Sequence, residues 1–418
     1  MARSRSLVYL ILVVFFVISL LTNIFGPIVP DIIRTFSVDL GAAGFLVFAF
    51  FIAYGVMSIP AGFLVESLRE KPVMIGAFLA AMSGSIGFAL HPTYKVAFVS
   101  LFVIGGGMAT LQVAINPLLR TAGGEEHFAL NETLAQVCFG SASFLSPWIY
   151  SYLVVHLPYR QDQGLLLHIL RRLTAESYPW VSLYWLFAAI AGGMALILVF
   201  IRFPAVHHTM DERPGTLSMY KGLMNRPLVW FYFGGIFAYV GCEQGTSNWM
   251  SQFLGYYHGI DPHTTGARAV SWFWGLMTSG CLIGVLLLRI FDSRRILIGA
   301  ATGALIALTM ALFGPSLLSL VAFPMVGLFA SVMWPIVISL SLNSVAEHHG
   351  SFTGILSTGI MGGAIVSVII GHVGDRIGLR GGMALLYLTL GYVWSIGFWS
   401  KPLVNNLTIT AKASEPAI

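Results

Sequence analysis

The residue of this sequence best placed to do chemistry is Glu243, the one acid deep inside an apolar run, from Gly234 to Leu254. An ionisable group at bilayer depth is costly, and sequences that keep one generally use it. Its carboxylate could bind a proton, coordinate Na⁺ through oxygen, or accept hydrogen bonds from hydroxyl groups. We therefore expect Glu243 to couple a cation, Na⁺ or H⁺. The alternative is a structural acid paired to backbone or to a neighbouring helix.

A second set of candidates consists of amides and aromatic rings within apolar runs. Amides both donate and accept hydrogen bonds, and a flat ring can cover the C–H face of a sugar-like solute. Gln112 and Asn116 are four residues apart, as are Gln244 and Asn248, so each pair shares a helix face. Any single amide could equally join two helices. The substrate-binding candidates are Asn23, Gln112, Asn116, Asn131, Gln136, Gln244, Asn248, Trp249, Trp272, Trp334 and Asn343.

The composition restricts the elements that can position these residues. Of 418 residues only 9% are charged and 57% are hydrophobic, and the mean hydropathy is +0.84. A soluble globular chain carries about 25% charged residues, so a water-covered surface of this size is excluded. Disorder, a coiled coil and a nucleic-acid partner are excluded as well. The three cysteines lie singly in apolar stretches, which predicts no disulfide and no metal site apart from Na⁺ at Glu243. No nucleotide-binding loop occurs, and we expect neither a cofactor nor enzyme activity.

Roughly twelve apolar runs reach the length, about 20 residues, that crosses a bilayer as a helix. Lysine and arginine are more frequent on the side of the N-terminus, which predicts that both termini are cytoplasmic. The longest polar cytoplasmic stretch follows the sixth run. It divides the chain into a six-helix bundle (1–203), a cytoplasmic linker (204–226), a second six-helix bundle (227–403) and a cytoplasmic tail (404–418). The amphipathic segment Leu165 to Leu173 is expected to lie on the outer membrane surface.

The two halves also resemble each other in sequence. Lys71-Pro72-Val73-Met74-Ile75-Gly76-Ala77 is similar to Arg294-Arg295-Ile296-Leu297-Ile298-Gly299-Ala300. A parallel repeat of six-helix halves, with the substrate site between them near the midplane, resembles the major facilitator superfamily. The resemblance implies an all-α membrane protein with twelve transmembrane helices in two pseudo-symmetric six-helix bundles.

The loop from Gly62 to Lys71 resembles the glycine–acid–basic loop motif of that superfamily. Glu66 takes the acidic place, but Arg69 stands where the motif has its second glycine. Asp292 and Arg294 are the remnant in the second half. We expect these four residues to gate the conformation through ion pairs and helix ends. Alternatively, these charges serve only to set the orientation of the helices in the membrane.

Three further segments resemble the fucose–proton symporter family, which includes bacterial fucose permease and the glucose/galactose transporters. They are Leu111 to Pro117, His127 to Asn131, and Tyr239 to Glu243, and Trp334-Pro335 is similar to the aromatic–proline step of the family. The resemblance implies a sugar substrate and a place in the bacterial inner (plasma) membrane.

The sequence departs from that family at two functional positions. The family has an acid in the first helix and another in the fourth, where this chain has Gly26 and Gln112. Asp31 lies nearby in sequence, at the outer end of the first run, and is not a match. Asn131 does match the asparagine of the fifth helix. The proton mechanism of the family therefore does not carry over.

We accordingly expect a secondary active transporter that moves a sugar or sugar-like solute by alternating access, coupled to Na⁺ or H⁺. The alternatives are an uncoupled facilitator of the same fold, an efflux transporter for drugs or metabolites, and a non-transporting receptor. Buried amides argue against the apolar cavity of a drug exporter, and the lack of a sizeable soluble domain argues against a receptor. The expected partners are the solute, the cation and the lipid bilayer, with the protein a monomer.

Overall fold

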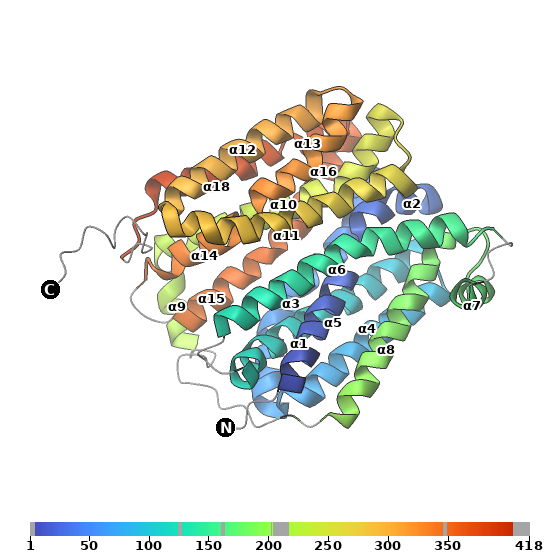
Figure 1. Cartoon of the computed structure of the whole chain (residues 1–418), viewed down its shortest axis with the longest axis horizontal. Helices are drawn as coiled ribbons and strands as arrows, with labels where there is room; N and C mark the ends of the chain where they lie inside the picture. Colours follow the sequence, from blue (N-terminus) through green and yellow to red (C-terminus); the bar gives the residue numbers. More distant parts are fainter. Residues whose placement is uncertain are drawn as a thin grey trace.

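Long helices that run between two ends of the molecule make up the fold (Figure 1). The structure is a computed structural model, and within the residues it describes it contains helices and no β-strand. The described residues are 5–123, 128–159, 164–201, 203, 217–345 and 349–403. Most of the expected linker and the whole expected tail lie outside them. The side chains of Glu66 and Asn116 are also outside what the structure describes.

The first half contains six long helical stretches, two of them interrupted, and one short helix. Its elements are α1 (Arg5–Thr22), α2 (Phe25–Phe36), α3 (Leu40–Leu68), α4 (Glu70–Leu90), α5 (Tyr94–Gly123), α6 (Phe128–His156), α7 (Leu165–Leu173), η2 (Pro179–Val181) and α8 (Ser182–Phe200).

The second half repeats this arrangement with more interruptions. Its elements are α9 (Leu217–Met224), α10 (Pro227–His258), η3 (Pro262–Gly266), α11 (Ala267–Ile290), α12 (Ser293–Phe313), α13 (Ser316–Ala330), α14 (Met333–Leu342), α15 (His349–Thr358), η4 (Gly359–Met361), α16 (Gly362–Ile377), α17 (Leu379–Met383) and α18 (Leu386–Trp399).

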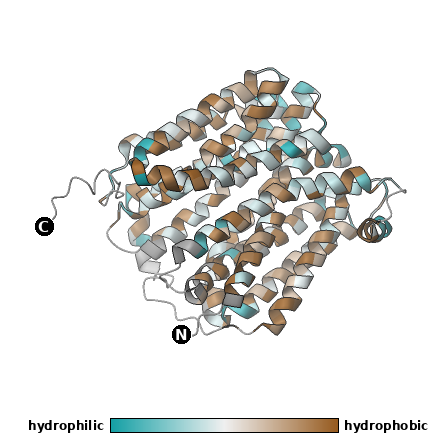
Figure 2. Cartoon of the chain, in the orientation of Figure 1, coloured by the Kyte–Doolittle hydropathy of each residue, from teal (hydrophilic) through white to brown (hydrophobic). Residues whose placement is uncertain are grey.

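Eleven helical stretches of the described chain are long and apolar enough to cross a membrane. The exception among the long helices is α10, which has 32 residues but carries Glu243, Gln244 and Asn248 in its middle. With α10 the described chain has the twelve crossings that the hydropathy predicts. In Figure 2 strongly hydrophobic residues lie along the helices, and apolar side chains such as Phe200, Leu317 and Leu388 are largely exposed. Such a surface is suited to lipid rather than to water.

Two short helices mark opposite ends of the molecule. α7 lies at one end and α9 at the other (Figure 1), and we call these the α7 end and the α9 end. The α7 end is the one that the sequence predicts to face outward. It also holds the starts of α3, α11 and α13 and the ends of α6, α10 and α16.

The two halves meet along three helix pairs: α2 with α10, α3 with α16, and α6 with α11. Glycines allow backbones to approach closely at these contacts. A Cβ atom on Gly26 of α2 would lie 2.3 Å from the carbonyl oxygen of Ser247 in α10. A Cβ atom on Gly371 of α16 would lie 2.4 Å from the carbonyl oxygen of Leu40 in α3. Any side chain at either position would separate the halves in this conformation.

The loop between α3 and α4 is strained at Arg69. This residue has φ 68° and ψ 168°, a backbone conformation that is favourable for glycine and costly for other residues. The superfamily motif has glycine at this position, so the loop keeps the backbone of the motif without its residue. Neighbouring Lys71 fixes the loop to α8, because its Nζ donates to the carbonyl oxygens of Val199 at 2.9 Å and Ile201 at 2.8 Å.

Replacing Arg69 by glycine is therefore expected to stabilise the protein. Relief of the backbone strain should raise the free energy of unfolding by about 1 kcal/mol, after the entropy cost of glycine is subtracted. Thermal unfolding in lipid nanodiscs measures the change. The matched control is Arg69→Ala, which removes the guanidinium group but keeps the strained backbone and should give no gain. Equal stabilisation by both variants would show that the charge, not the backbone, is responsible.

Candidate functional site

Glu243 lies in the middle of α10 and is held by two polar neighbours. Nε2 of Gln244 donates to its Oε1 at 2.9 Å, and the hydroxyl of Tyr239, one turn earlier, lies near the same carboxylate. The ring of Trp334 lies 5.9 Å, between centroids, from that of Tyr239. Glu243, Gln244, Tyr239 and Trp334 therefore form one group, which we call the Glu243 cluster. It combines a carboxylate, an amide, a hydroxyl and an aromatic ring.

A helix break lies beside this cluster. α13 ends at Ala330 and α14 begins at Met333, and Pro335 follows within the first turn of α14. Proline has no N–H, so it cannot donate to the carbonyl oxygen of Ser331 four residues earlier. The thiol of Cys281, from α11, occupies that oxygen instead, with Sγ at 3.3 Å. Cys281 is also within electrostatic range of Glu243, so the break and the carboxylate share one neighbourhood.

A second break, between α1 and α2, lies at Asn23. Its Nδ2 donates to Oγ of Ser143 in α6 at 2.8 Å, and the Ser19 and Ser143 hydroxyl oxygens are 2.6 Å apart. Ser19 also donates to the carbonyl oxygen of Phe139 at 2.5 Å. Asn23 thus joins α1 to α6 in this conformation, which is the structural role that the sequence left open for any single amide.

Three of the candidates on α10 face α16. Trp249 is fully buried, and its Nε1 donates to the carbonyl oxygen of Ser367 at 3.2 Å. Nδ2 of Asn248 lies 3.5 Å from Oγ of Ser367. The side chain of Gln244 packs against Gly363, although its amide reaches Glu243. The structure therefore places Trp249 and Asn248 in the packing between α10 and α16.

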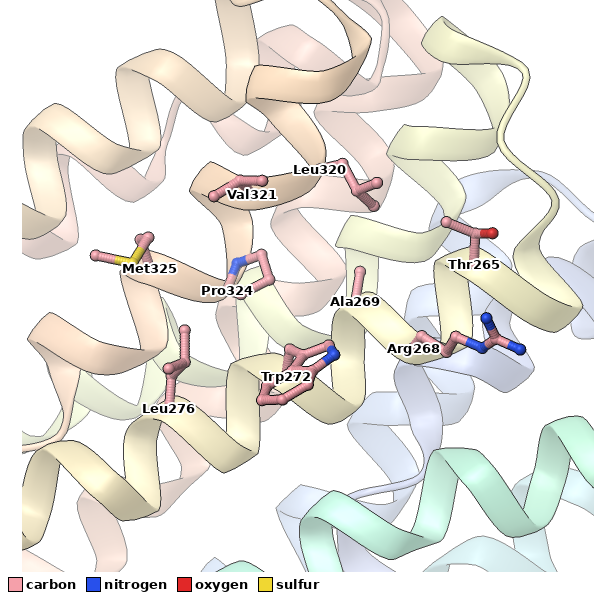
Figure 3. Close-up of a pocket in the computed structure, with 9 residues that line it drawn as sticks. All are labelled: Thr265, Arg268, Ala269, Trp272, Leu276, Leu320, Val321, Pro324 and Met325. Atoms are coloured by element: carbon pink, nitrogen blue, oxygen red, sulfur yellow. The ribbon is translucent and has the colours of Figure 1, made fainter.

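Trp272 lies elsewhere, in an apolar groove between α11 and α13 (Figure 3). The groove has a volume of about 390 Å³ and opens on the side of the molecule. The ring of Trp272 is 53% exposed and packs edge-on against Phe144 of α6, with 5.6 Å between centroids. At the α7 end of the groove, the guanidinium of Arg268 lies over the ring of Trp148, 5.2 Å from its centroid. This surface is suited to a hydrocarbon chain and lacks the amides that a sugar would need.

The remaining amides are spread along the helices. Gln112 is half-buried on α5, and Asn131 is buried near the start of α6. Gln136 is exposed and donates to Oε1 of Glu132 at 3.1 Å. Asn343 ends α14 at the α9 end, where its carbonyl oxygen accepts from the N–H of Leu403 at 2.7 Å. The structure does not bring these four residues into contact with the Glu243 cluster.

The expected gating residues of the second half contact each other. Asp292 caps α12 by accepting from the backbone N–H of Arg294 at 2.9 Å, and it pairs with Nε of Arg294 at 3.3 Å. This pair lies within one loop and does not join the halves in this conformation. Arg69 is exposed, at the strained position described above.

Sequence reasoning missed the polar contacts that do join the halves. Oδ1 of Asp31 lies 2.9 Å from Nε2 of His263, and the hydroxyl of Tyr150 donates to Oδ2 of Asp31. Asp375 accepts from the backbone N–H groups of Leu40 and Gly41. Asp31 matches no motif of the fucose–proton symporter family, so the sequence gives no reason to single it out. Its burial, with 6% of its surface exposed, could not be read from its position at the end of an apolar run.

Comparison with known proteins identifies the family. The sequence signature described as "Major Facilitator Superfamily" matches residues 11–368. This chain belongs to the major facilitator superfamily. The expected fold of twelve transmembrane helices in two six-helix bundles is therefore confirmed, as is the expectation of an integral membrane transporter rather than an enzyme.

Two named relatives align with about nine tenths of this chain. It is 27% identical over 392 residues to a "Glucose/galactose transporter" of Brucella abortus biovar 1 (strain 9-941), covering 91% of this chain and 90% of that protein. It is 26% identical over 396 residues to the "L-fucose-proton symporter" of Escherichia coli (strain K12), covering 90% and 89%. The similarity to the fucose–proton symporter family that the motifs indicate is confirmed.

Solved structures show the same fold. The E. coli fucose:proton symporter matches with a TM-score of 0.67 at 21% identity, covering 94% of this chain and 98% of that one. A bacterial homolog of the human lysosomal transporter Spinster, solved in an inward-facing and unoccupied conformation, matches with a TM-score of 0.76 at 13% identity, covering 94% and 96%.

The packing around Gly26 gives a physical reason for one departure from the fucose–proton symporter family. This is the position at which the resemblance places the acid of the first helix. In this chain a Cβ atom there would lie 2.3 Å from the carbonyl oxygen of Ser247 and 3.0 Å from a methyl group of Val270. A carboxylate has no space at Gly26 when the halves are packed in this way.

The different burial of Trp249 and Trp272 predicts that their replacement lowers the free energy of unfolding by different amounts. Trp249→Phe removes a buried indole and its bond to Ser367, and should lower the free energy of unfolding by roughly 2 kcal/mol. Trp272→Phe changes an exposed ring and should alter it by less than about 0.5 kcal/mol. Thermal unfolding in one detergent compares the two. A larger cost at Trp272 than at Trp249 would contradict the assignment of Trp249 to the core.

Proposed function

We propose that this protein is a secondary active transporter that carries a sugar or sugar-like solute across the membrane by alternating access, with transport coupled to Na⁺ or H⁺ through Glu243. We further propose that it acts as a monomer in a bacterial plasma membrane, with both termini cytoplasmic and the α7 end outside. The domain boundaries are those that the sequence predicts.

The observation that carries this proposal is the Glu243 cluster. A carboxylate and an amide can accept and donate hydrogen bonds to sugar hydroxyls, and an aromatic ring can cover a sugar C–H face. Gln244 and Tyr239 supply the amide and the hydroxyl within one turn of Glu243, and Trp334 supplies a ring in contact with the ring of Tyr239. The adjacent break places the Ser331 carbonyl oxygen in the same neighbourhood, as broken helices do at transporter sites.

The relatives support the choice of substrate class. Two of them carry the names glucose/galactose transporter and L-fucose-proton symporter. Their coupling ion is not transferred, because Gly26 and Gln112 stand where the fucose–proton symporter family has acids. Glu243 is the carboxylate that remains in the middle of an apolar helix, so coupling through a cation is assigned to it. Uncoupled facilitation, or efflux of drugs or metabolites, remains as the alternative.

Counterflow and gradient-driven uptake of radiolabelled hexoses and deoxyhexoses into proteoliposomes test the proposal. For Glu243→Gln we expect counterflow to persist and uptake driven by a Na⁺ or pH gradient to fall roughly tenfold or more, because the amide cannot change its charge. The matched control is Glu176→Gln, at an exposed acid between α7 and η2, which should behave as wild type.

The outcomes separate the alternatives. Uptake that follows the Na⁺ gradient assigns Na⁺ to Glu243, and uptake that follows the pH gradient assigns H⁺. Gradient-independent flux that is equal in wild type and Glu243→Gln would make the protein a facilitator. Absence of flux with every sugar, combined with drug resistance of cells that express the gene, would favour efflux.

Tyr239 should position the carboxylate. Tyr239→Phe removes the hydroxyl near Glu243 while keeping the ring beside Trp334, and a hydrogen bond to a charged group is worth about 1.5–3 kcal/mol. We expect the concentration of the coupling cation that gives half-maximal uptake to change by about tenfold. The control is Tyr232→Phe, whose hydroxyl lies 2.8 Å from Oγ of Ser344 near the α9 end. Equal effects of the two changes would argue against a role of Tyr239 at Glu243.

A further inference from the structure

Three hydrogen bonds between described residues join the two halves at the α7 end. Within the part of the chain that the structure describes, they are the bonds of Asp375 to the backbone of α3 and the bond between Asp31 and His263. Each has one partner in the first half and one in the second. All of them therefore break when the halves separate at this end, and they favour the conformation in which it is closed.

The first of these contacts is a helix cap made across the interface. Asp375, near the end of α16, accepts from the N–H of Leu40 at 2.9 Å and of Gly41 at 2.8 Å. These are the first two residues of α3, where free N–H groups and the helix dipole favour a carboxylate. Gly41 leaves room for it, since a Cβ atom there would lie 2.9 Å from Oδ2 of Asp375. Asp39 caps the same helix end from within, at 2.7 Å from the N–H of Ala42.

The loop that carries Asp375 repeats the gating motif of the first half at the opposite end of the molecule. Gly371, Asp375, Gly378 and Arg380 have the spacing of Gly62, Glu66, Arg69 and Lys71. The backbone repeats too, with φ 85° and ψ 153° at Gly378 and φ 68° and ψ 168° at Arg69. The loop with both glycines, Gly371 and Gly378, is therefore the one whose acid, Asp375, bonds to the other half in this conformation.

The second contact can change its charge. Asp31 on α2 has a side chain 8% exposed, and His263 on η3 has one 23% exposed. Histidine is the side chain that ordinarily gains a charge between about pH 8 and 5. A neutral imidazole can only hydrogen-bond to Asp31, whereas an imidazolium also forms an ion pair with it. The bond from Tyr150 of α6 holds the carboxylate in place.

The charged groups around His263 come from each side. Asp31 and Arg34 belong to α2, and Asp261 lies two residues before His263 in the chain. The ring of Tyr150, from α6, also faces the His263 ring. Burial alone would raise the pKa of Asp261, but bonds from the Thr264 hydroxyl and the His263 backbone N–H lower it below its ordinary value. Asp261 thus stays charged beside His263 over the range in which histidine titrates. Arg268 of α11 is directed at the Trp148 ring.

We propose that Asp31, His263 and Asp375 form a latch that closes the α7 end, and that a proton bound at His263 strengthens it. Opening of this end separates His263 from Asp31 and so favours release of the proton, while acid favours closure. The proton site is distinct from Glu243 and does not depend on which solute is carried. The inference rests on alternating access, and identification of the α7 end with the outer side rests on the proposed orientation.

The distance between the halves at the α7 end tests the latch without any solute. Spin labels are placed at Lys95 on α5 and Leu317 on α13, both exposed at this end. Cys138, Cys242 and Cys281 are first replaced by serine, and the thermal unfolding of that background is compared with wild type. Double electron–electron resonance in nanodiscs then measures the distance between the two spin labels. Its distribution gives the ratio of open to closed populations at pH 5.5 and pH 8.0.

With His263 present, the ratio of open to closed should rise about fivefold between pH 5.5 and pH 8.0, as expected for one partly exposed ion pair. His263→Gln keeps a hydrogen-bonding group without the charge and should abolish this dependence. Asp31→Asn should do the same and serves if His263→Gln fails to fold. Asp375→Asn should increase the open population at both pH values while the pH-dependent ratio stays.

Two other histidines near this end provide controls. His258 lies at the end of α10, and Nδ1 of His372 lies 3.1 Å from the carbonyl oxygen of Val368 in its own helix. His258→Gln and His372→Gln should leave the pH dependence intact. The proposal is overturned if the labelled protein shows no pH dependence, or if the dependence survives in both His263→Gln and Asp31→Asn. Neither result bears on sugar transport, so failure of the latch and failure of the proposed function are distinguishable.

Discussion

The structure depends on the satisfaction of backbone polar groups where no water is available to bond them. In hydrocarbon each free N–H or C=O is costly, which makes helices the default for every crossing. A helix can be interrupted only where another group takes over the lost bond. Pro335 creates such a gap at Ser331, and the thiol of Cys281 fills it. The break beside Glu243 is therefore possible because α11 supplies a donor at the right depth.

The same constraint shapes the interface between the halves. Their helices approach each other at glycines. At Gly26 the packing is so close that an added Cβ atom would lie 2.3 Å from a backbone oxygen of the other half. Contacts of this kind hold only in one relative position of the halves, because a small displacement loses them. Among the described residues, the direct polar bonds that we find across this interface lie at the α7 end, where Asp31, His263 and Asp375 make them. A close-packed glycine interface is thus compatible with a protein that must separate the same surfaces repeatedly.

The sequence predicted the crossings, the division into halves and the position of Glu243, because length, hydropathy and an acid deep inside an apolar run are local properties. The sequence could not show which neighbouring helix each side chain faces. Gln244 and Asn248 share a helix face as their spacing predicts, yet the structure turns that face toward α16. Trp249 and Trp272 looked alike in sequence, but one is in the core and the other in a side groove. Asp31 and His263 are 232 residues apart, and no periodicity connects them. The motif spacing around Asp375 is present in the sequence, but it does not show that this carboxylate reaches the first turn of α3.

The bond between Cys281 and Ser331 bears on the binding of solute or cation that we propose at the Glu243 cluster. A thiol is a weak donor, so it covers the backbone oxygen left by Pro335 without binding it strongly. Replacement of that thiol by a hydroxyl group or a hard cation would exchange a poor partner for a better one at little desolvation cost. The proline thus leaves a backbone oxygen in the membrane interior that the thiol covers in this conformation, and that a solute or cation bound as we propose would contact in its place.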